Sequence, residues 1–209
     1  MNFKHAYSVI DQAMGPSASP LMDGWCTVEK AVRLVQLCAE HCPRLGVELG
    51  VFGGRSLLAM ALGCASAGRG RVEGIDAYTV DAALESEMDP SHIEYWRNID
   101  YEKILRSATD SLEKYGVSRH ATILRSKSLD SVSRYADGSI DILHQDSNHS
   151  PAVSCAEIDA FIPKVVPGGI WVMDDIDWPS TVKAQQKLLE LGARLVETYG
   201  KWGVYRLPA

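Results

Sequence analysis

The chain has 209 residues, 46% of them hydrophobic, which is enough for one sizeable core, so we expect a single domain over residues 1–209. A formal net charge of −6 leaves little to neutralise a phosphate backbone and disfavours a dedicated nucleic-acid binder. No apolar run approaches the roughly 18 residues of a membrane span, and no signal-like segment follows Met1, so we expect a cytoplasmic protein without membrane contacts.

The cysteines also favour a reducing compartment, because their number is odd and none has CxxC spacing. Cys38 and Cys42 lie one helical turn apart and could hold a metal, although two small buried residues are the simpler interpretation. The five cysteines are Cys26, Cys38, Cys42, Cys64 and Cys155.

From residue 27 the chain alternates between helical and strand-like periodicity. Residues 1–26, with Pro16 and Pro20, are predicted to be a loosely structured N-terminal lead-in. The predicted helices are 27–42, 56–67, 128–135, 152–165 and 179–191. The predicted strands are 46–50, 71–75, 121–124, 140–144 and 169–173. This alternation predicts a mostly parallel sheet with helices on both faces.

The end of the chain departs from the alternation. Two strand-like runs, 193–199 and 202–207, flank Gly200 and Lys201, which predicts a hairpin. The expected fold class is therefore α/β: a Rossmann-like, doubly wound, mostly parallel seven-stranded sheet with a C-terminal antiparallel hairpin.

Between the second and third strands lies an insertion. Residues 79–116 supply about 38 residues where a single crossover helix would suffice. We expect the insertion to be a substrate lid. Its segment 85–97 mixes charge with aromatic residues, which fits a closing lid and a solvated helix face equally well.

A glycine-rich loop follows the first strand. Gly50, Gly53 and Gly54 stand where ligands bind in an open parallel sheet, and glycine lets a ligand approach the backbone closely. A turn with no ligand would need glycines too. The loop lacks the GxGxxG spacing that suits a pyrophosphate.

Two acidic residues near this loop point to a cofactor. Glu48 lies inside an apolar strand, where a carboxylate requires a donor or a cation. Asp76 ends the second strand, where a carboxylate can accept both hydroxyls of a ribose. Capping of neighbouring helices is the alternative role for both.

The runs ELGVFGGRS and GIDA resemble the pattern of class I S-adenosylmethionine-dependent methyltransferases, especially the small-molecule O-methyltransferases. The resemblance extends from about residue 25 to the end, and Gly24-Trp25 is similar to one bacterial branch. It implies a cofactor site in which Asp76 holds the ribose and one of the residues 126–128 flanks the adenine. The implied cofactor-binding residues are Glu48, Gly50, Phe52, Gly53, Ser56, Asp76, Ala77, Ser126, Lys127, Ser128 and Asp146.

Carboxylates also follow the fourth and fifth strands. Asp146, Asp174 and Asp175 should converge because parallel strands end at one edge of a sheet, and three carboxylates brought together repel unless a cation joins them. Hard oxygen ligands suit Mg²⁺, with Mn²⁺ or Ca²⁺ as substitutes. Helix caps and an exposed His149 are the alternative interpretation.

These aspartates resemble the metal ligands of the metal-dependent O-methyltransferases. The resemblance implies that Asp146, Asp174 and Asp175 bind the cation and that Asp146 and His149 are catalytic, with His149 as the base. The bacterial relatives usually carry Asp-Gly-Asp-His, whereas residues 146–149 here read Asp-Ser-Asn-His, so the glycine of the turn is lost and Asn148 brings no charge. His144 is expected to pack within its strand.

Asp177 and Trp178 follow the fifth strand closely. They could supply a further acid and a pocket wall.

The leading hypothesis is an S-adenosylmethionine-dependent, metal-dependent O-methyltransferase acting on a small hydroxylated molecule. A nucleotide- or NAD-dependent enzyme on a related sheet is one alternative, against which the hairpin and the missing GxGxxG argue. A non-catalytic cofactor-binding protein is the other, and it has no evident use for the clustered aspartates. The partners we allow for are a small molecule and a second copy of the chain in a homodimer.

Overall fold

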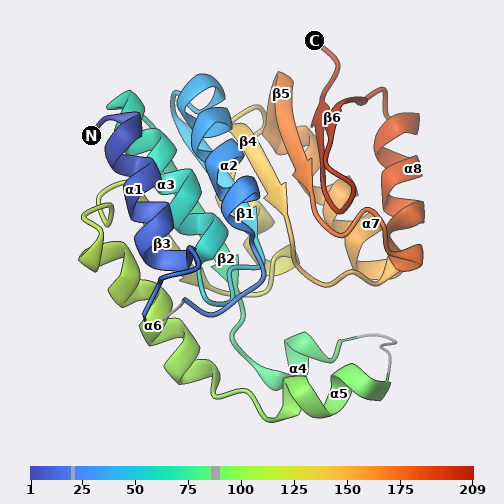
Figure 1. The fold of residues 1–209 in the computed structure, drawn as a ribbon. Helices are drawn as coiled ribbons and strands as arrows, with labels where there is room; N and C mark the ends of the chain where they lie inside the picture. The colour runs from blue at the N-terminus through green and yellow to red at the C-terminus, as the bar shows by residue number, and fades with distance from the viewer. Residues whose placement is uncertain (20–21, 86–89) are drawn as a thin grey trace.

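The computed structural model describes residues 1–19, 22–85 and 90–209, within which seven strands form one sheet (Figure 1). The strand order is β3-β2-β1-β4-β5-β7-β6; β1 to β5 pair in parallel, and β7 is antiparallel to both β5 and β6. The strands are β1 (Leu45–Leu49), β2 (Arg71–Asp76), β3 (Ala121–Arg125), β4 (Ile140–Gln145), β5 (Val165–Met173), β6 (Arg194–Thr198) and β7 (Gly203–Arg206). The predicted fold class, including its antiparallel hairpin, is confirmed.

Helices cover both faces of the sheet. One hydrophobic cluster joins the sheet to α1, α2, α3 and α6, and a second joins it to α7 and α8 (Figure 1). Alternate residues of β5 serve the two clusters, with Val172 in the first and Trp171 in the second. The α-helices are α1 (Phe3–Met14), α2 (Val28–His41), α3 (Arg55–Ala67), α4 (Val80–Ala83), α5 (Pro90–Arg97), α6 (Tyr101–Lys114), α7 (Pro151–Phe161) and α8 (Val182–Glu190).

The expectation of a loosely structured lead-in over residues 1–26 is wrong for its first half. Asn2 caps α1 by accepting a hydrogen bond from the backbone N–H of His5 at 2.9 Å. Apolar residues then recur at helical spacing and are buried: Ala6, Val9, Ile10, Ala13 and Met14. Pro16 comes after the helix has ended, so it does not disturb it. Residues 20–21 of the lead-in lie outside the described residues.

Several predicted boundaries shift because of short 3₁₀ segments. The helix expected at 128–135 is the 3₁₀ helix η1 (Leu129–Arg134), and α8 is preceded by η3 (Pro179–Thr181). The helix expected at 152–165 ends earlier and is followed by η2 (Ile162–Lys164), because Pro163 has no N–H for an α-helical bond. Strand β5 accordingly begins at Val165, with an irregular register against β4.

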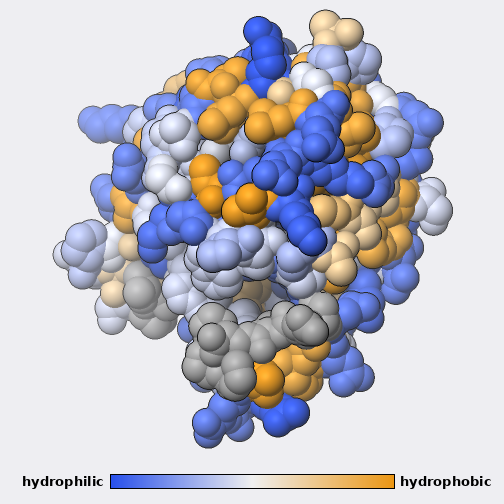
Figure 2. Space-filling view, turned by 90° about the vertical axis from the view of Figure 1, so that its right-hand side faces the viewer, coloured by the Kyte–Doolittle hydropathy of each residue, from blue (hydrophilic) through white to orange (hydrophobic). Residues whose placement is uncertain are grey.

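The insertion between β2 and β3 contains α4, α5 and α6. Helix α6 packs beside α3 and serves as the crossover, whereas α4 and α5 lie beyond the carboxyl ends of the strands (Figure 1). In Figure 2 the surface is hollowed between the body of the molecule and the lower part that carries these two helices. Residues 86–89 of the predicted lid segment lie outside the described residues. No helix within the described ranges is both long and apolar enough to span a bilayer.

Candidate active site

The loops at the carboxyl ends of β1, β2 and β5 are conformationally strained. Among the described residues, the non-glycine residues with positive φ are Phe52 (47°), Tyr78 (50°) and Asp175 (48°), one in each loop. Such conformations are costly for residues with a side chain and concentrate at functional sites. They lie on either side of the point between β1 and β4 where the strand order reverses, which is where open parallel sheets bind ligands.

The glycines of the first loop bring backbones close together. A Cβ at Gly50, where φ is 85°, would lie 2.1 Å from the Asp146 carbonyl oxygen. A Cβ at Gly53 would lie 2.1 Å from the Asp23 carbonyl oxygen. The loop is thus packed against the end of β4 and against the chain before α2. Ser56, in the first turn of α3, is buried beside it.

Asp76 ties the first two loops together. One carboxylate oxygen accepts from the backbone N–H groups of Val51 and Phe52 at 3.0 and 2.9 Å, and the other accepts from Tyr78 at 2.8 Å. The Tyr78 side chain is buried, and its hydroxyl donates to the Phe52 carbonyl at 2.9 Å. Ala77 lies between Asp76 and Tyr78 in the sequence. Asp76 therefore orders the loop, and its contact with a ribose remains a prediction.

Glu48 and His144 form a buried pair across neighbouring strands. Both are fully buried and opposite each other in the β1–β4 register, with Glu48 Oε1 2.8 Å from His144 Nδ1. Burial lowers the pKa of His144 and so favours the neutral ring. Glu48 Oε2 and His144 Nε2 are buried without a hydrogen-bond partner. His144 does pack within its strand, but an orphaned polar atom at each end of the pair is unusual and calls for a ligand or water.

Lys30 of α2 enters the acidic cluster, which the sequence interpretation did not foresee. Its side chain is 3% exposed, its ammonium hydrogen-bonds to Asp174, and it lies 3.6 Å from Asp146 Oδ2. A lysine in an amphipathic helix usually faces solvent, but Lys30 precedes Leu34 by four residues and so belongs to the buried stripe. That spacing was the available signal.

The Lys30 ammonium affects the pKa values of the two nearest aspartates, Asp146 and Asp174, to different extents. Burial alone would raise the pKa of Asp174, but Lys30 lowers it below its usual range. Burial and the neighbouring Asp174 charge raise the pKa of Asp146 well above its usual range, and Lys30 only partly opposes them. Asp174 is thus the ionised partner of Lys30, and Asp146 lacks a full counter-charge.

The expected triad of aspartates divides into two groups that share Asp146. The inner group is His144, Asp146 and Asp174, and the outer group is Asp146, His149 and Asp175. Within each group one ligand atom per residue lies within 4.8 Å of the others. In the outer group His149 Nε2 is 3.1 Å from Asp175 Oδ2 and 3.8 Å from Asp146 Oδ1. Neither Cys38 nor Cys42 belongs to such a group among the described residues, and both thiols are free and buried.

Burial shapes the ionisation of the outer group. It lowers the pKa of His149 to about 4, and it raises the pKa of Asp175 to about 6 with help from the Asp174 charge. Near neutral pH the imidazole is therefore uncharged and balances neither carboxylate. Trp178 forms a wall beside it, with ring centroids 5.3 Å apart, whereas Asp177 is exposed.

Glu157 explains how the Asp-Ser-Asn-His turn holds its shape. Ser147 donates to the Glu157 carboxylate at 2.7 Å, and Ser128 and Gln145 bond to the same buried group. Asn148 accepts from the backbone N–H of Ser150 at 2.9 Å. Serine and asparagine thus fix the turn by side-chain bonds. Glu157 was not anticipated, because its role depends on three distant donors.

The three residues expected near an adenine point in different directions. Ser126 donates to the Lys127 carbonyl, Lys127 pairs with the Glu85 carboxylate at 2.9 Å, and Ser128 bonds to Glu157. Their adenine contact remains a prediction.

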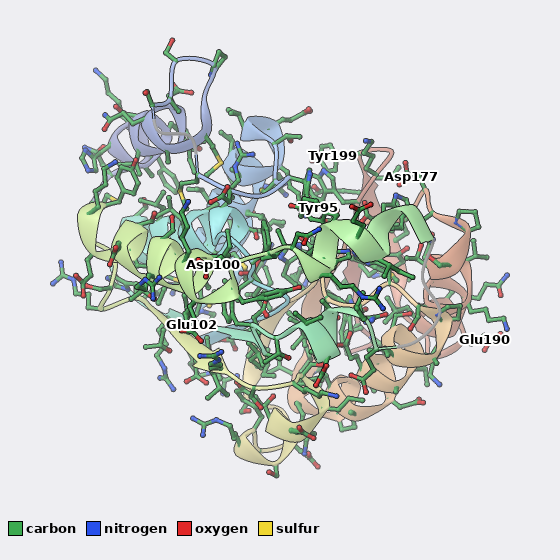
Figure 3. The ribbon with its side chains drawn as sticks, turned by 90° about the horizontal axis from the view of Figure 1, so that it is seen from below. Tyr95, Asp100, Glu102, Asp177, Glu190 and Tyr199 are labelled. Carbon is green, nitrogen blue, oxygen red and sulfur yellow. The ribbon has the colours of Figure 1, made fainter. Side chains whose placement is uncertain are left out.

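An aromatic cluster, Trp25, Phe52, Tyr95 and Trp96, covers the first loop. Trp25 stacks on Phe52 with ring centroids 5.1 Å apart, and Trp96 of α5 packs edge-on against both at 6.0 and 5.7 Å. Figure 3, seen from below, shows α5 lying across the molecule with Tyr95 on it. The cluster joins the segment before α2, the glycine loop and the insertion.

Comparison with known proteins identifies the family. Residues 47–176 match the family model of a methyltransferase domain. No curated protein matches the chain. The solved O-methyltransferase NovP has a TM-score of 0.72 at 12% identity, with 99% of this chain and 96% of that one covered. The O-methyltransferase TomG of Streptomyces achromogenes, solved with SAM, gives 0.64 at 17% identity, with 98% and 90% covered. An O-methyltransferase of Bacillus cereus, solved with SAH, gives 0.62 at 16% identity, with 99% and 89% covered.

The family match spans most of the chain, and the solved structures share its fold. The chain therefore belongs to this methyltransferase family. The class I S-adenosylmethionine-dependent methyltransferase expected from the loop and strand-end motifs is confirmed, and the NAD-dependent alternative is disfavoured.

We expect the His149 imidazole of the metal-free protein to titrate near pH 4. Because the folded pKa lies below the ordinary 6.5, the unfolded chain takes up this proton first, and the group destabilises the fold as the pH falls from about 6.5 towards 4. Ring ¹⁵N chemical shifts, assigned with the His149→Asn variant, would measure the midpoint. A midpoint near 6.5 would contradict the burial argument.

Proposed function

We propose that this methyltransferase transfers the methyl group of S-adenosylmethionine to a hydroxyl of a small molecule, with a divalent cation at the acidic cluster. The observation that carries the proposal is the outer group: two carboxylates and a neutral imidazole beside the glycine-rich loop that follows β1, here called the cofactor loop. A site of this composition suits a bound cation and a hydroxyl that must lose its proton.

The cofactor would lie over the loop that follows β1. Asp76 uses its oxygens for three backbone N–H groups, and a carboxylate has about four acceptor sites, so capacity remains for a ribose hydroxyl. Glu48 Oε2, which is buried without a hydrogen-bond partner, would accept from the methionine ammonium. Gly50, Phe52 and Ser56 would line the rest of the site around the methionine part of the cofactor.

The donor set fits a divalent cation. Asp146, Asp174 and Asp175 together have one paired ammonium, Lys30, and Lys201 acts on Asp175 more weakly still. Burial and repulsion between these carboxylates raise the pKa of Asp146 and of Asp175, and a bound cation would favour their ionised forms. Asp146 and Asp175 would be the principal ligands, since both oxygens of Asp174 already accept, from Lys30 and from the Asp175 backbone N–H. Oxygen ligands with a nearby imidazole suit Mg²⁺ or Mn²⁺.

The low pKa of His149 supports a role for that cation. A phenol has a pKa of about 10, so an imidazole of pKa about 4 leaves a gap of about 6 units, or roughly 8 kcal/mol, for proton transfer. A divalent cation bound here would lower the pKa of a hydroxyl that it coordinates.

The chain's own residues then have three tasks. The cofactor loop aligns the methyl group with the acceptor oxygen. The aromatic side chains around the site, among them Trp25, Trp96 and Trp178, exclude water. His149 accepts the hydroxyl proton as the oxygen–methyl bond forms. The methyl–sulfur bond breaks, and sulfur keeps the electron pair, which gives S-adenosylhomocysteine.

We further propose that α4 and α5 form the lid expected from the insertion. The Glu85 carbonyl accepts from the Asn148 side chain at 2.7 Å, and the Glu85 carboxylate pairs with Lys127 at 2.9 Å. The insertion is therefore tied to the loops after β3 and β4, and through Trp96 to the loop after β1. These contacts support a lid that closes over bound cofactor and acceptor.

The Asp76→Asn variant should bind S-adenosylhomocysteine at least tenfold more weakly than the wild type, on the order of the loss of one charge-assisted contact. Calorimetry with S-adenosylhomocysteine and with NAD measures this. Asp110→Asn, at an exposed site on α6, is the control and should bind normally. Tight binding of NAD together with no binding of S-adenosylhomocysteine would refute the cofactor site.

The Asp175→Asn variant should bind Mn²⁺ at least tenfold more weakly, because it loses a charged ligand of the outer group. Electron paramagnetic resonance of free Mn²⁺ reports the affinity. Asp177→Asn removes an exposed carboxylate two residues away and should have little effect. Product screening with labelled cofactor supplies an activity assay; methylation that survives both exhaustive chelation and Asp175→Ala would eliminate the metal role.

The Trp96→Ala variant should loosen the lid, because Trp96 contacts both Trp25 and Phe52. Amide hydrogen exchange in α5 should become about tenfold faster, corresponding to roughly 1.4 kcal/mol of local stability. Phe3→Ala, which removes an exposed aromatic residue of α1, is the matched control. Unchanged exchange in α5 would argue against a lid held by the aromatic cluster.

A further inference from the structure

The ammonium of Lys30 occupies a place suited to a metal ion. It hydrogen-bonds to Asp174 and lies 3.6 Å from Asp146, so it faces two of the three members of the inner group. Lys30 therefore contacts two of the three residues that form the inner group.

The third member points to a cation as well. His144 is fully buried, and its Nδ1 is hydrogen-bonded to Glu48. Its Nε2 has no hydrogen-bond partner and lies 4.0 Å from Asp146 Oδ2. A neutral imidazole and two carboxylates are a common ligand set for divalent transition metals. Without the Lys30 ammonium, the inner group would be a metal site in addition to the outer group, with all of its ligands supplied by side chains.

The helix holds Lys30 in this place. Thr27 caps α2 and accepts from the Lys30 backbone N–H at 3.2 Å, which fixes the first turn over the cluster. The neighbouring Ala31 and Leu34 are fully buried, so the side chain leaves a packed surface and has little freedom to turn to solvent.

We propose that Lys30 is a positioning residue that fills the inner cation position with its ammonium and so confines the divalent cation to the outer group. This inference rests on the proposed function. One carboxylate, Asp146, serves both positions: it faces Lys30 on one side and His149 on the other. The covalently attached charge occupies the inner position and leaves a single metal position, at the side where His149 and Trp178 lie.

Manganese stoichiometry tests the proposal on the full chain stripped of metal. We expect the wild type to bind one Mn²⁺ and Lys30→Met, which keeps the length but removes the charge, to bind two. Adding His144→Gln to Lys30→Met should return the count to one. Lys30→Arg, which retains a cation, and Lys187→Met, which breaks an exposed ion pair with Asp159, should each bind one. A merely structural role for Lys30 would not raise the count.

Each other outcome decides between the two proposals. One Mn²⁺ in Lys30→Met with wild-type affinity would overturn the role of Lys30 and leave the proposed function standing. No Mn²⁺ in the wild type but one in Lys30→Met would support the inner position and refute the metal in the proposed function. No Mn²⁺ in either protein would refute both.

If Lys30→Met does not fold, the wild type supplies the test. A crystal structure with Mn²⁺, located by anomalous scattering, should place the ion at the outer group with Lys30 still on Asp174. An ion between His144 and Asp174 with Lys30 displaced would overturn the proposal.

Discussion

The buried ion pair between Lys30 and Asp174 is the contact around which the acidic edge of the sheet is arranged. An isolated charge at such depth would be very costly, and one partner without the other would leave that cost uncompensated. The pair joins α2 to the end of β5 across 144 residues of sequence. Its single positive charge leaves Asp146 and Asp175 without a full counter-charge, and the cation proposed for the outer group would supply one.

A second set of contacts holds the cofactor loop in an unfavourable backbone conformation. Phe52 and Tyr78 both have positive φ, and both donate backbone N–H groups to Asp76. The Tyr78 hydroxyl closes the arrangement by donating to the Phe52 carbonyl. These hydrogen bonds offset the cost of the strained backbone.

The walls of the site come from segments that are far apart in sequence. Trp25 precedes α2, Phe52 follows β1 and Trp96 belongs to the insertion, yet their rings are in contact. Asn148 links the turn after β4 to the same insertion. The departure from an Asp-Gly-Asp-His turn thus has a structural use, because the asparagine side chain links the turn to the insertion.

The sequence by itself determined the sheet, the hairpin and the edge at which Asp76, Asp146 and Asp175 gather, since periodicity identifies strands and parallel strands end on one side. Only the tertiary structure decided which groups meet there. Lys30 lies in the cluster because of the way α2 packs on the sheet, and the pKa of His149 is lowered because neighbouring elements partly bury it. Depth and charge neighbours are properties of packing between distant segments, and local pattern does not encode them.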